Sequence, residues 1–415
     1  MDIKALLASV DEKACLDFLS MMVQQKSHSE TDGEIALTRR MVEELNKAGI
    51  EGELQTFDDG KGGRRHNAIG RIRGAGGGKS LLFNGHLDTN PVTEGWTVDP
   101  YGGLVDEEFI YGIGVSNMKA GDAAYFCAAR TLLDNGVKLK GDLILTFVVG
   151  ELQGGIGSAN SIRQGVTADY FINSEPTDLV ALTMHAEGCG FEIHLVGDTR
   201  HMSKREEATD AILAACDLIP RLTELKFSGA KSPEHESISR LHVGVVHGAL
   251  GQELEEWRPP QVADFVRIKG SGRFAPGQTP EGAFADIRKE LKALEGRWPG
   301  LKATLIPRER KDIPVMGSFE VAKDSRIVKA INSAYETVRG APQPTGTDHP
   351  ARFYGTDAGH YYNTAGMEGI VCGPGGRYNT MPDERVEIVD FIDMIKIYML
   401  CMLDICEVAE TSKPA

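Results

Sequence analysis

Residues 80–90 read Ser-Leu-Leu-Phe-Asn-Gly-His-Leu-Asp-Thr-Asn, and this stretch decides how the rest of the chain is interpreted. It begins with a short apolar run, Ser80–Phe83, which predicts a buried strand. His86 follows this run, and Asp88 comes two residues later. Functional side chains in open α/β sheets collect at the carboxyl ends of the strands. The stretch therefore predicts an α/β sheet with a functional site at its edge.

Strands and helices alternate on both sides of this stretch. Two helices are expected within the first ~50 residues, where apolar residues recur at helical spacing. The continuous apolar run Leu143–Val149 is typical of a central strand. The other expected strands lie at 68–72, 171–172 and 369–372, and the other expected helices at 118–135, 321–338 and 389–406. This alternation predicts an α/β domain, a mixed sheet with helices on both faces.

The pattern changes between residues 187 and 306. Alternating apolar residues at 191, 193 and 195 predict a half-exposed strand, and further strands are expected at 241–246 and 262–268. Helices are expected at 208–219 and 280–294. This order predicts a separate α+β sandwich at 187–306, inserted between segments 1–186 and 307–415 of the catalytic domain.

Composition narrows the classes of partner. The chain has 415 residues and a net charge of −15, without a Lys/Arg-rich run. This argues against nucleic acid or an anionic membrane as a partner, but leaves room for a local basic pocket that binds a small anionic substrate. The N-terminus is too charged for a signal peptide and no apolar run is long enough to span a bilayer, so a cytoplasmic location is expected.

Three more polar residues stand where a site would form. Glu151 follows the strand expected at Leu143–Val149, and Glu175 follows a short strand at 170–173. Asn117 lies in a Gly-rich turn, 112–119, that enters a helix. Each residue alone has an ordinary structural explanation, such as a helix cap or a solvated side chain.

Taken together, these motifs resemble the zinc aminopeptidase-like metallohydrolases, which include aminoacylases, acetylornithine deacetylase, succinyl-diaminopimelate desuccinylase and bacterial glutamate carboxypeptidase. The resemblance implies that His86 and Glu175 bind a metal and that Asp88 orients the ligands. It implies that Glu151 is the general base. It also implies an inserted lid domain that forms a homodimer, with His201 reaching the partner's site.

The chain departs from this family at three positions. Asn117, Leu152 and Thr380 stand where the family has Asp, Glu and His ligands of a second metal. Because Leu cannot bind a metal and Asn is uncharged, we expect one divalent ion per chain, held by His86, Asn117 and Glu175. Imidazole with oxygen donors suits Mn²⁺, Zn²⁺ or Fe²⁺, and we expect Mn²⁺.

The substrate is the least determined feature of the sequence. Arg273 and Arg377 are candidate clamps for a carboxylate, and His360 follows a loop that resembles the family's substrate loop. The depleted metal site resembles 5-nitroanthranilate aminohydrolase, which implies hydrolytic deamination of an electron-poor aromatic amine. Aminoacylase- or carboxypeptidase-like cleavage of an N-acyl amino acid is the alternative, and a non-enzymatic ligand-binding protein is the second alternative.

Overall fold

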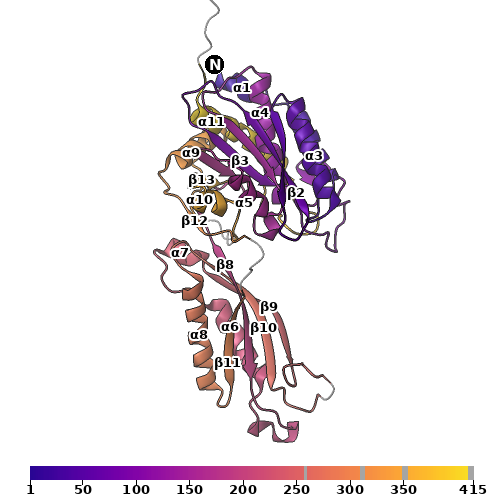
Figure 1. Ribbon diagram of the computed structural model, residues 1–415, viewed down its shortest axis with the longest axis vertical. Coiled ribbons are helices and arrows are strands. Elements are labelled where there is room, and N and C mark those ends of the chain that lie inside the picture. The colour runs from indigo at the N-terminus through magenta and orange to yellow at the C-terminus, as the bar shows by residue number, and fades with distance from the viewer. Residues whose placement is uncertain (257–258, 309–313, 348–353, 410–415) are drawn as a thin grey trace, which may run out of the picture. The chain divides into compact units, whose positions relative to one another are not determined.

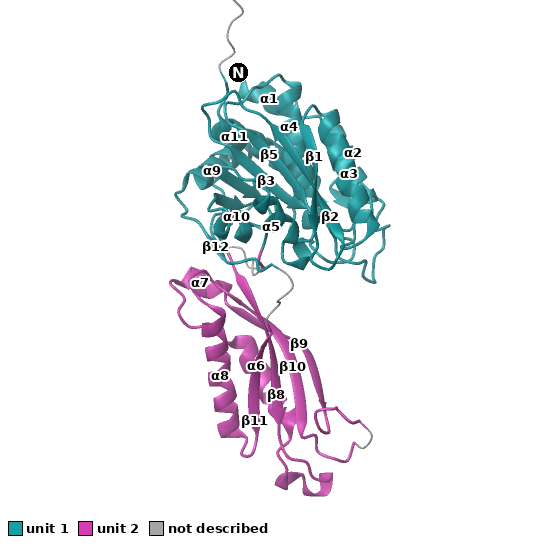
Figure 2. Ribbon diagram, viewed as in Figure 1, with its two compact units in different colours: residues 1–184, 312–349, 356–415 teal, residues 185–311, 350–355 magenta. Residues whose placement is uncertain are grey.

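The computed structural model describes residues 1–256, 259–308, 314–347 and 354–409. The chain divides into two compact units (Figure 2). The larger unit comprises Met1–Met184, Asp312–His349 and Thr356–Ala415. The smaller unit comprises His185–Lys311 and Pro350–Gly355.

The larger unit is built on a six-stranded sheet with the order β1-β2-β5-β3-β6-β13 (Figure 1). Pairs β1–β2 and β2–β5 are antiparallel, whereas β5–β3, β3–β6 and β6–β13 are parallel. The sheet is therefore mixed, as predicted. Its strands are β1 (Glu51–Asp58), β2 (Arg64–Ile72), β5 (Leu143–Val148), β3 (Leu81–His86), β6 (Tyr170–Asn173) and β13 (Glu368–Val371).

Helices cover both faces of this sheet. Neighbouring residues of β3 point to opposite faces, so their contacts show which helices cover each face. Phe83 packs against Tyr125 of α4 (Ala120–Asp134) and Tyr398 of α11 (Ile388–Cys406), with ring centroids 5.6 and 4.8 Å apart. The next residue, Asn84, donates hydrogen bonds to Ser158 of α5 (Ile156–Arg163) and Tyr361 of α10 (Ala358–Asn363). This arrangement confirms the predicted fold class.

The outer elements of the larger unit differ in detail from the prediction. Three helices precede the sheet instead of two, because the side chain of Asp11 accepts from the Ala14 amide and caps a new helix. The helix expected from residue 321 begins only at Arg326. The remaining elements are α1 (Ile3–Ala8), α2 (Glu12–Gln24), α3 (Asp32–Lys47), α9 (Arg326–Arg339), β7 (Met184–His185) and β12 (Phe319–Glu320).

A pair of short strands brings together two segments that are far apart in the sequence. β4 (Phe109–Tyr111) pairs antiparallel with β14 (Arg385–Glu387). This pairing places the residues just before β14 beside the Gly-rich turn that follows β4.

The smaller unit has a four-stranded antiparallel sheet with the order β11-β8-β10-β9. Phe191, Ile193 and Leu195 of β8 point into one core, which they share with α6 (Ala211–Glu224) and α8 (Pro280–Arg297). The inserted domain is therefore an antiparallel sheet covered by helices, as expected. The four strands are β8 (Glu187–Val196), β9 (Arg240–Ala249), β10 (Phe265–Phe274) and β11 (Lys302–Arg308), and the unit also contains the short helix α7 (Pro233–Ile238).

Candidate metal centre

Three strands of the larger unit deliver the side chains of the site. His86 is the last residue of β3, and Glu151 and Glu175 follow β5 and β6, which flank β3 on either side. Because all three strands are parallel, their carboxyl ends meet at one edge of the sheet. His86, Glu151 and Glu175 therefore converge because each ends or follows a buried strand of the same parallel set.

The ligand atoms of this cluster lie close together. His86 Nε2 lies 3.1 Å from Asn117 Oδ1, 3.6 Å from Glu175 Oε1 and 4.0 Å from Glu151 Oε2. Within the described part of the chain, His86, Glu151 and Glu175 are the one group of three or more such side chains whose ligand atoms lie within 4.8 Å of each other. One imidazole and two carboxylates, all buried, fit a divalent ion.

The electrostatics of the cluster also fit a cation. Burial raises the pKa of Glu175 to about 7, and burial together with Glu175 raises the pKa of Glu151 well above its ordinary value. Burial alone lowers the pKa of His86, but Glu175, Asp88 and Glu151 raise it to about 10. An imidazolium therefore compensates the carboxylates here, and a metal ion would take over that role on binding.

Asp88 acts on two partners through different groups. Its backbone carbonyl lies 2.9 Å from His86 Nδ1, which fixes the ring so that Nε2 faces the cluster. Its carboxylate accepts instead from the amides of Gly150 and Glu151, at 2.8 and 3.3 Å, and from the hydroxyl of Ser29 at 2.9 Å. The carboxylate thus supports the turn that carries Glu151, while the main chain orients His86.

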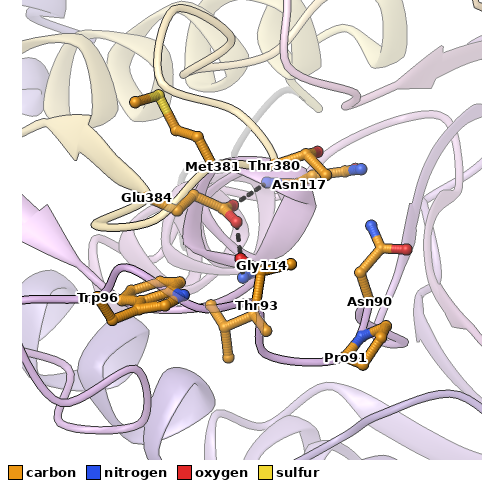
Figure 3. A pocket seen from close by; sticks show the side chains of 10 residues that line it. Asn90, Pro91, Thr93, Trp96, Gly114, Asn117, Thr380, Met381 and Glu384 are labelled. Atoms are coloured by element: carbon orange, nitrogen blue, oxygen red, sulfur yellow. Dashed lines mark hydrogen bonds between the residues drawn. The ribbon is translucent and has the colours of Figure 1, made fainter.

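Glu384 holds the turn that carries Asn117 (Figure 3). Its carboxylate is buried and accepts from the amides of Ser116 at 2.8 Å, Asn117 at 3.0 Å and Gly114 at 3.3 Å. Burial raises the pKa of Glu384 to about 7, although these three donors favour its charged form. Sequence patterns gave no sign of this role, because Glu384 lies about 270 residues from its partners.

A cavity of about 40 Å³ opens beside Asn117 (Figure 3). Thr380 lines it, so two of the three positions expected for second-metal ligands face the same space. Neither side chain is charged, and the carboxylate of Glu384 is already bound to backbone amides. The third such position, Leu152, lies in the short turn Glu151–Gln153.

The predicted substrate residues have different surroundings. His360 is buried, and its Nε2 lies 2.8 Å from the carbonyl of Gly154, at the turn behind Glu151. Arg377 is exposed and donates to Glu387 at 2.7 Å. Arg273 and His201 belong to the smaller unit, in β10 and in the loop after β8 respectively. Their roles at the site stay predictions.

Asp122 is a second residue that sequence patterns did not identify. It is fully buried in the first turn of α4, where its Oδ1 accepts from the hydroxyl of Tyr125 at 2.7 Å. A Cβ on Gly85 would lie 2.1 Å from the same oxygen, so Gly85 is required beside it. An acid among the small apolar residues of this helix was the available signal.

Comparison with known proteins agrees with this geometry. The sequence description of Peptidase family M20/M25/M40 matches residues 82–404. The chain belongs to this family. It is a metal-dependent hydrolase that acts on C–N bonds, as predicted.

Individual relatives of this M20 hydrolase are distant. The chain is 24% identical over 333 residues to an acetylornithine deacetylase from Vibrio atlanticus, which covers 78% of this chain and 83% of the relative. It is 26% identical over 357 residues to an N-formyl-4-amino-5-aminomethyl-2-methylpyrimidine deformylase from Bacillus subtilis, covering 78% and 79%. The crystal structure of aminopeptidase PepT from Bacillus cereus superposes with a TM-score of 0.74 at 18% identity, covering 96% of this chain and all of the other.

The named relatives also bear on the type of substrate. They act on amides or peptides, so amide hydrolysis, the alternative considered from the sequence, is better supported than deamination of an aromatic amine.

Among the described residues, no helix is both long and apolar enough to cross a bilayer.

Proposed function

We propose that this chain uses one divalent metal ion, Mn²⁺ by preference, to hydrolyse the amide C–N bond of a small N-acylated amine or amino acid. The observation that carries the proposal is the convergence of His86, Glu151 and Glu175 at the edge of the sheet. The named deacetylase and deformylase relatives support a small acyl group.

The proposed roles follow from position. His86, Asn117 and Glu175 would hold the ion, which when bound lowers the pKa of water and polarises the carbonyl of the substrate. Glu151 accepts the proton of the attacking water and delivers it to the leaving nitrogen. A carboxylate whose pKa is raised by burial suits both steps, because a general acid–base group works best near the operating pH.

The uncharged residues at the second-metal positions support a single ion. Asn117 and Thr380 face one cavity without offering it a negative charge. Asn117 can still donate its amide oxygen to one ion, at 3.1 Å from the His86 nitrogen that would be its co-ligand.

Hydrolytic removal of the amino group of 5-nitroanthranilate is a second candidate function. The uncharged residues that line the cavity beside Asn117 support this reaction because they favour a single ion. One ion assists the attack of water less than two ions would, and an electron-poor ring needs less assistance than an amide. N-acyl amino acids and 5-nitroanthranilate both carry a carboxylate, and for such substrates we propose Arg377, Arg273 and His360 as binding residues.

A direct assay separates these functions. Purified protein, stripped of metal and reloaded with Mn²⁺, Zn²⁺ or Fe²⁺, is incubated with N-acetyl-L-ornithine, other N-acetyl and N-formyl amino acids, dipeptides and 5-nitroanthranilate. Release of a free amine from the acylated substrates supports the proposal. Ammonia from 5-nitroanthranilate alone would establish the second candidate, and absence of all turnover with every metal would contradict both.

We also propose that the smaller unit forms a homodimer. β9 lies at one edge of its sheet, and Val245 and Val246 on this strand are 39% and 45% exposed. Leu213 on α6, which packs on β9, is 54% exposed. A long apolar edge strand pairs readily with another chain, and a dimer built there would cover these side chains. Within such a dimer, we propose that His201 serves the partner's site.

A further inference from the structure

The turn that carries Glu151 has little stiffness of its own. It consists of Glu151–Gln153 between Gly150 and Gly154, both of which have φ of +77°. Glycine adopts this conformation without strain but is also the most mobile residue in the chain. The position of Glu151 must therefore come from contacts made by the turn.

One set of contacts is the carboxylate of Asp88 beneath the amides, and another comes from Arg65 of β2. Arg65 Nη1 donates to Gln153 Oε1 at 3.0 Å. A Cβ on Gly150 would lie 2.6 Å from the same nitrogen, so the guanidinium packs directly against the backbone at the start of the turn. Arg65 therefore contacts the turn at both of its ends.

Arg65 is itself held in place by Glu34 of α3. Its Nε and Nη2 donate to the two carboxylate oxygens of Glu34 at 2.9 and 2.5 Å. Both side chains are buried, at 7% and 2% exposure. A bidentate pair of this kind fixes the plane of the guanidinium and so the direction of Nη1.

We infer that Arg65 and Gln153 position the general base. Arg65, held by Glu34, donates a hydrogen bond to the Gln153 side chain and thereby fixes the position of Glu151 relative to His86. This inference rests on the proposed function in that Glu151 is the base. Neither Arg65 nor Gln153 touches the reacting atoms. Both are positioning residues that act through the turn.

Gln153→Leu tests this directly, because it removes the acceptor oxygen while the Arg65–Glu34 pair stays intact. With the fastest substrate of the panel, we expect kcat to fall about tenfold, since a charge-assisted hydrogen bond of this type is lost. KM and the Kd for Mn²⁺ should stay within about twofold, because the metal ligands are untouched. Gln153→Glu, which keeps an acceptor oxygen for Arg65, should restore kcat.

A second measurement does not depend on turnover. Hydrogen exchange of the amides of residues 150–154 should speed up at least about fivefold in Gln153→Leu and in Arg65→Lys, whose single ammonium cannot serve Glu34 and Gln153 together. Gln164→Leu is the control, because among the described contacts the side chain of Gln164 donates only to the carbonyl of Thr56. It should change neither quantity.

The outcomes separate this inference from the proposed function. Unchanged kcat and unchanged exchange in Gln153→Leu would overturn the inference, and so would a loss of Mn²⁺ affinity as large as the loss of kcat. Glu151→Gln, assayed in parallel, tests the base itself. If that variant keeps wild-type activity, the proposed role of Glu151 fails even where the exchange data show that Arg65 holds the turn.

Discussion

Replacing Asp88 by Asn should damage the base more than the metal. The carboxylate accepts from Gly150 at 2.8 Å, Glu151 at 3.3 Å and Ser29 at 2.9 Å. The best orientation of Asn keeps its oxygen toward the amides of Gly150 and Glu151, but each of these bonds loses its charge assistance, at about 1 kcal/mol apiece. The NH₂ group then faces the Leu152 amide, whose longer bond of 3.4 Å to the carboxylate is lost. About 2 kcal/mol corresponds to a fall of roughly 30-fold in kcat if the turn shifts. The orientation of His86 should survive, because its partner is the backbone carbonyl of residue 88.

The assay is therefore a comparison of two constants. kcat is measured with the best substrate of the panel, and the Kd for Mn²⁺ by competition with a chelator. We expect the Kd to rise only about threefold, from the loss of one nearby charge. Ser29→Ala, which removes a donor but keeps the carboxylate, is the control and should change kcat less than about threefold. A 30-fold weaker Kd with unchanged kcat would refute this account of Asp88.

Elemental analysis after dialysis should find one Mn²⁺ per chain, lost in His86→Ala and kept in Glu151→Gln; two tightly bound ions would contradict a single site. Because the pKa of His86 is raised from 6.5 to about 10, the stabilisation that its protonation provides is complete below pH 6.5 and is lost as the pH rises through 10. Thermal unfolding should therefore show metal-free protein losing stability from pH 7 to 10, and the Mn²⁺-loaded form should not. Confirmed heterodimers of His201→Ala and Glu151→Gln chains should recover activity that each parent lacks, whereas none would return if His201 acts within its own chain. Restoring all three family ligands of the second metal together should create a second site by calorimetric titration, whereas single reversals should not.

The fold could be predicted where apolar residues recur in a clear pattern along the sequence. The continuous apolar run of β5 and the alternation in β8 predicted their strands, because burial on two faces or on one leaves different patterns. The division between α1 and α2 was missed, since the apolar spacing runs on across Asp11 and only the cap breaks the helix. Where one helix ends and the next begins depends on a single side-chain hydrogen bond.

Some residues of the candidate site could likewise be predicted from the sequence, and others could not. His86, Glu151 and Glu175 could be found because each directly follows a strand, and parallel strands bring their ends together. Glu384 and Arg65 could not be found, because their partners are distant in the chain and a charged residue in a sequence gives no sign of burial. Local motifs therefore identify the side chains for which we propose the chemistry, whereas the side chains that hold them depend on the folded structure.

Charge explains why the three replacements at the second-metal positions belong together. Two divalent ions would bring four positive charges, whereas Glu151, Glu175 and Asp88 together supply three negative ones. These carboxylates suffice for one ion, and an uncompensated buried charge costs several kcal/mol. Asn117→Asp alone would add a carboxylate without a cation, so we expect it to raise the pKa of His86 further rather than to bind a second ion. Leu152→Glu and Thr380→His must accompany it, because only the complete set supplies both the charge and the donors that a second ion needs.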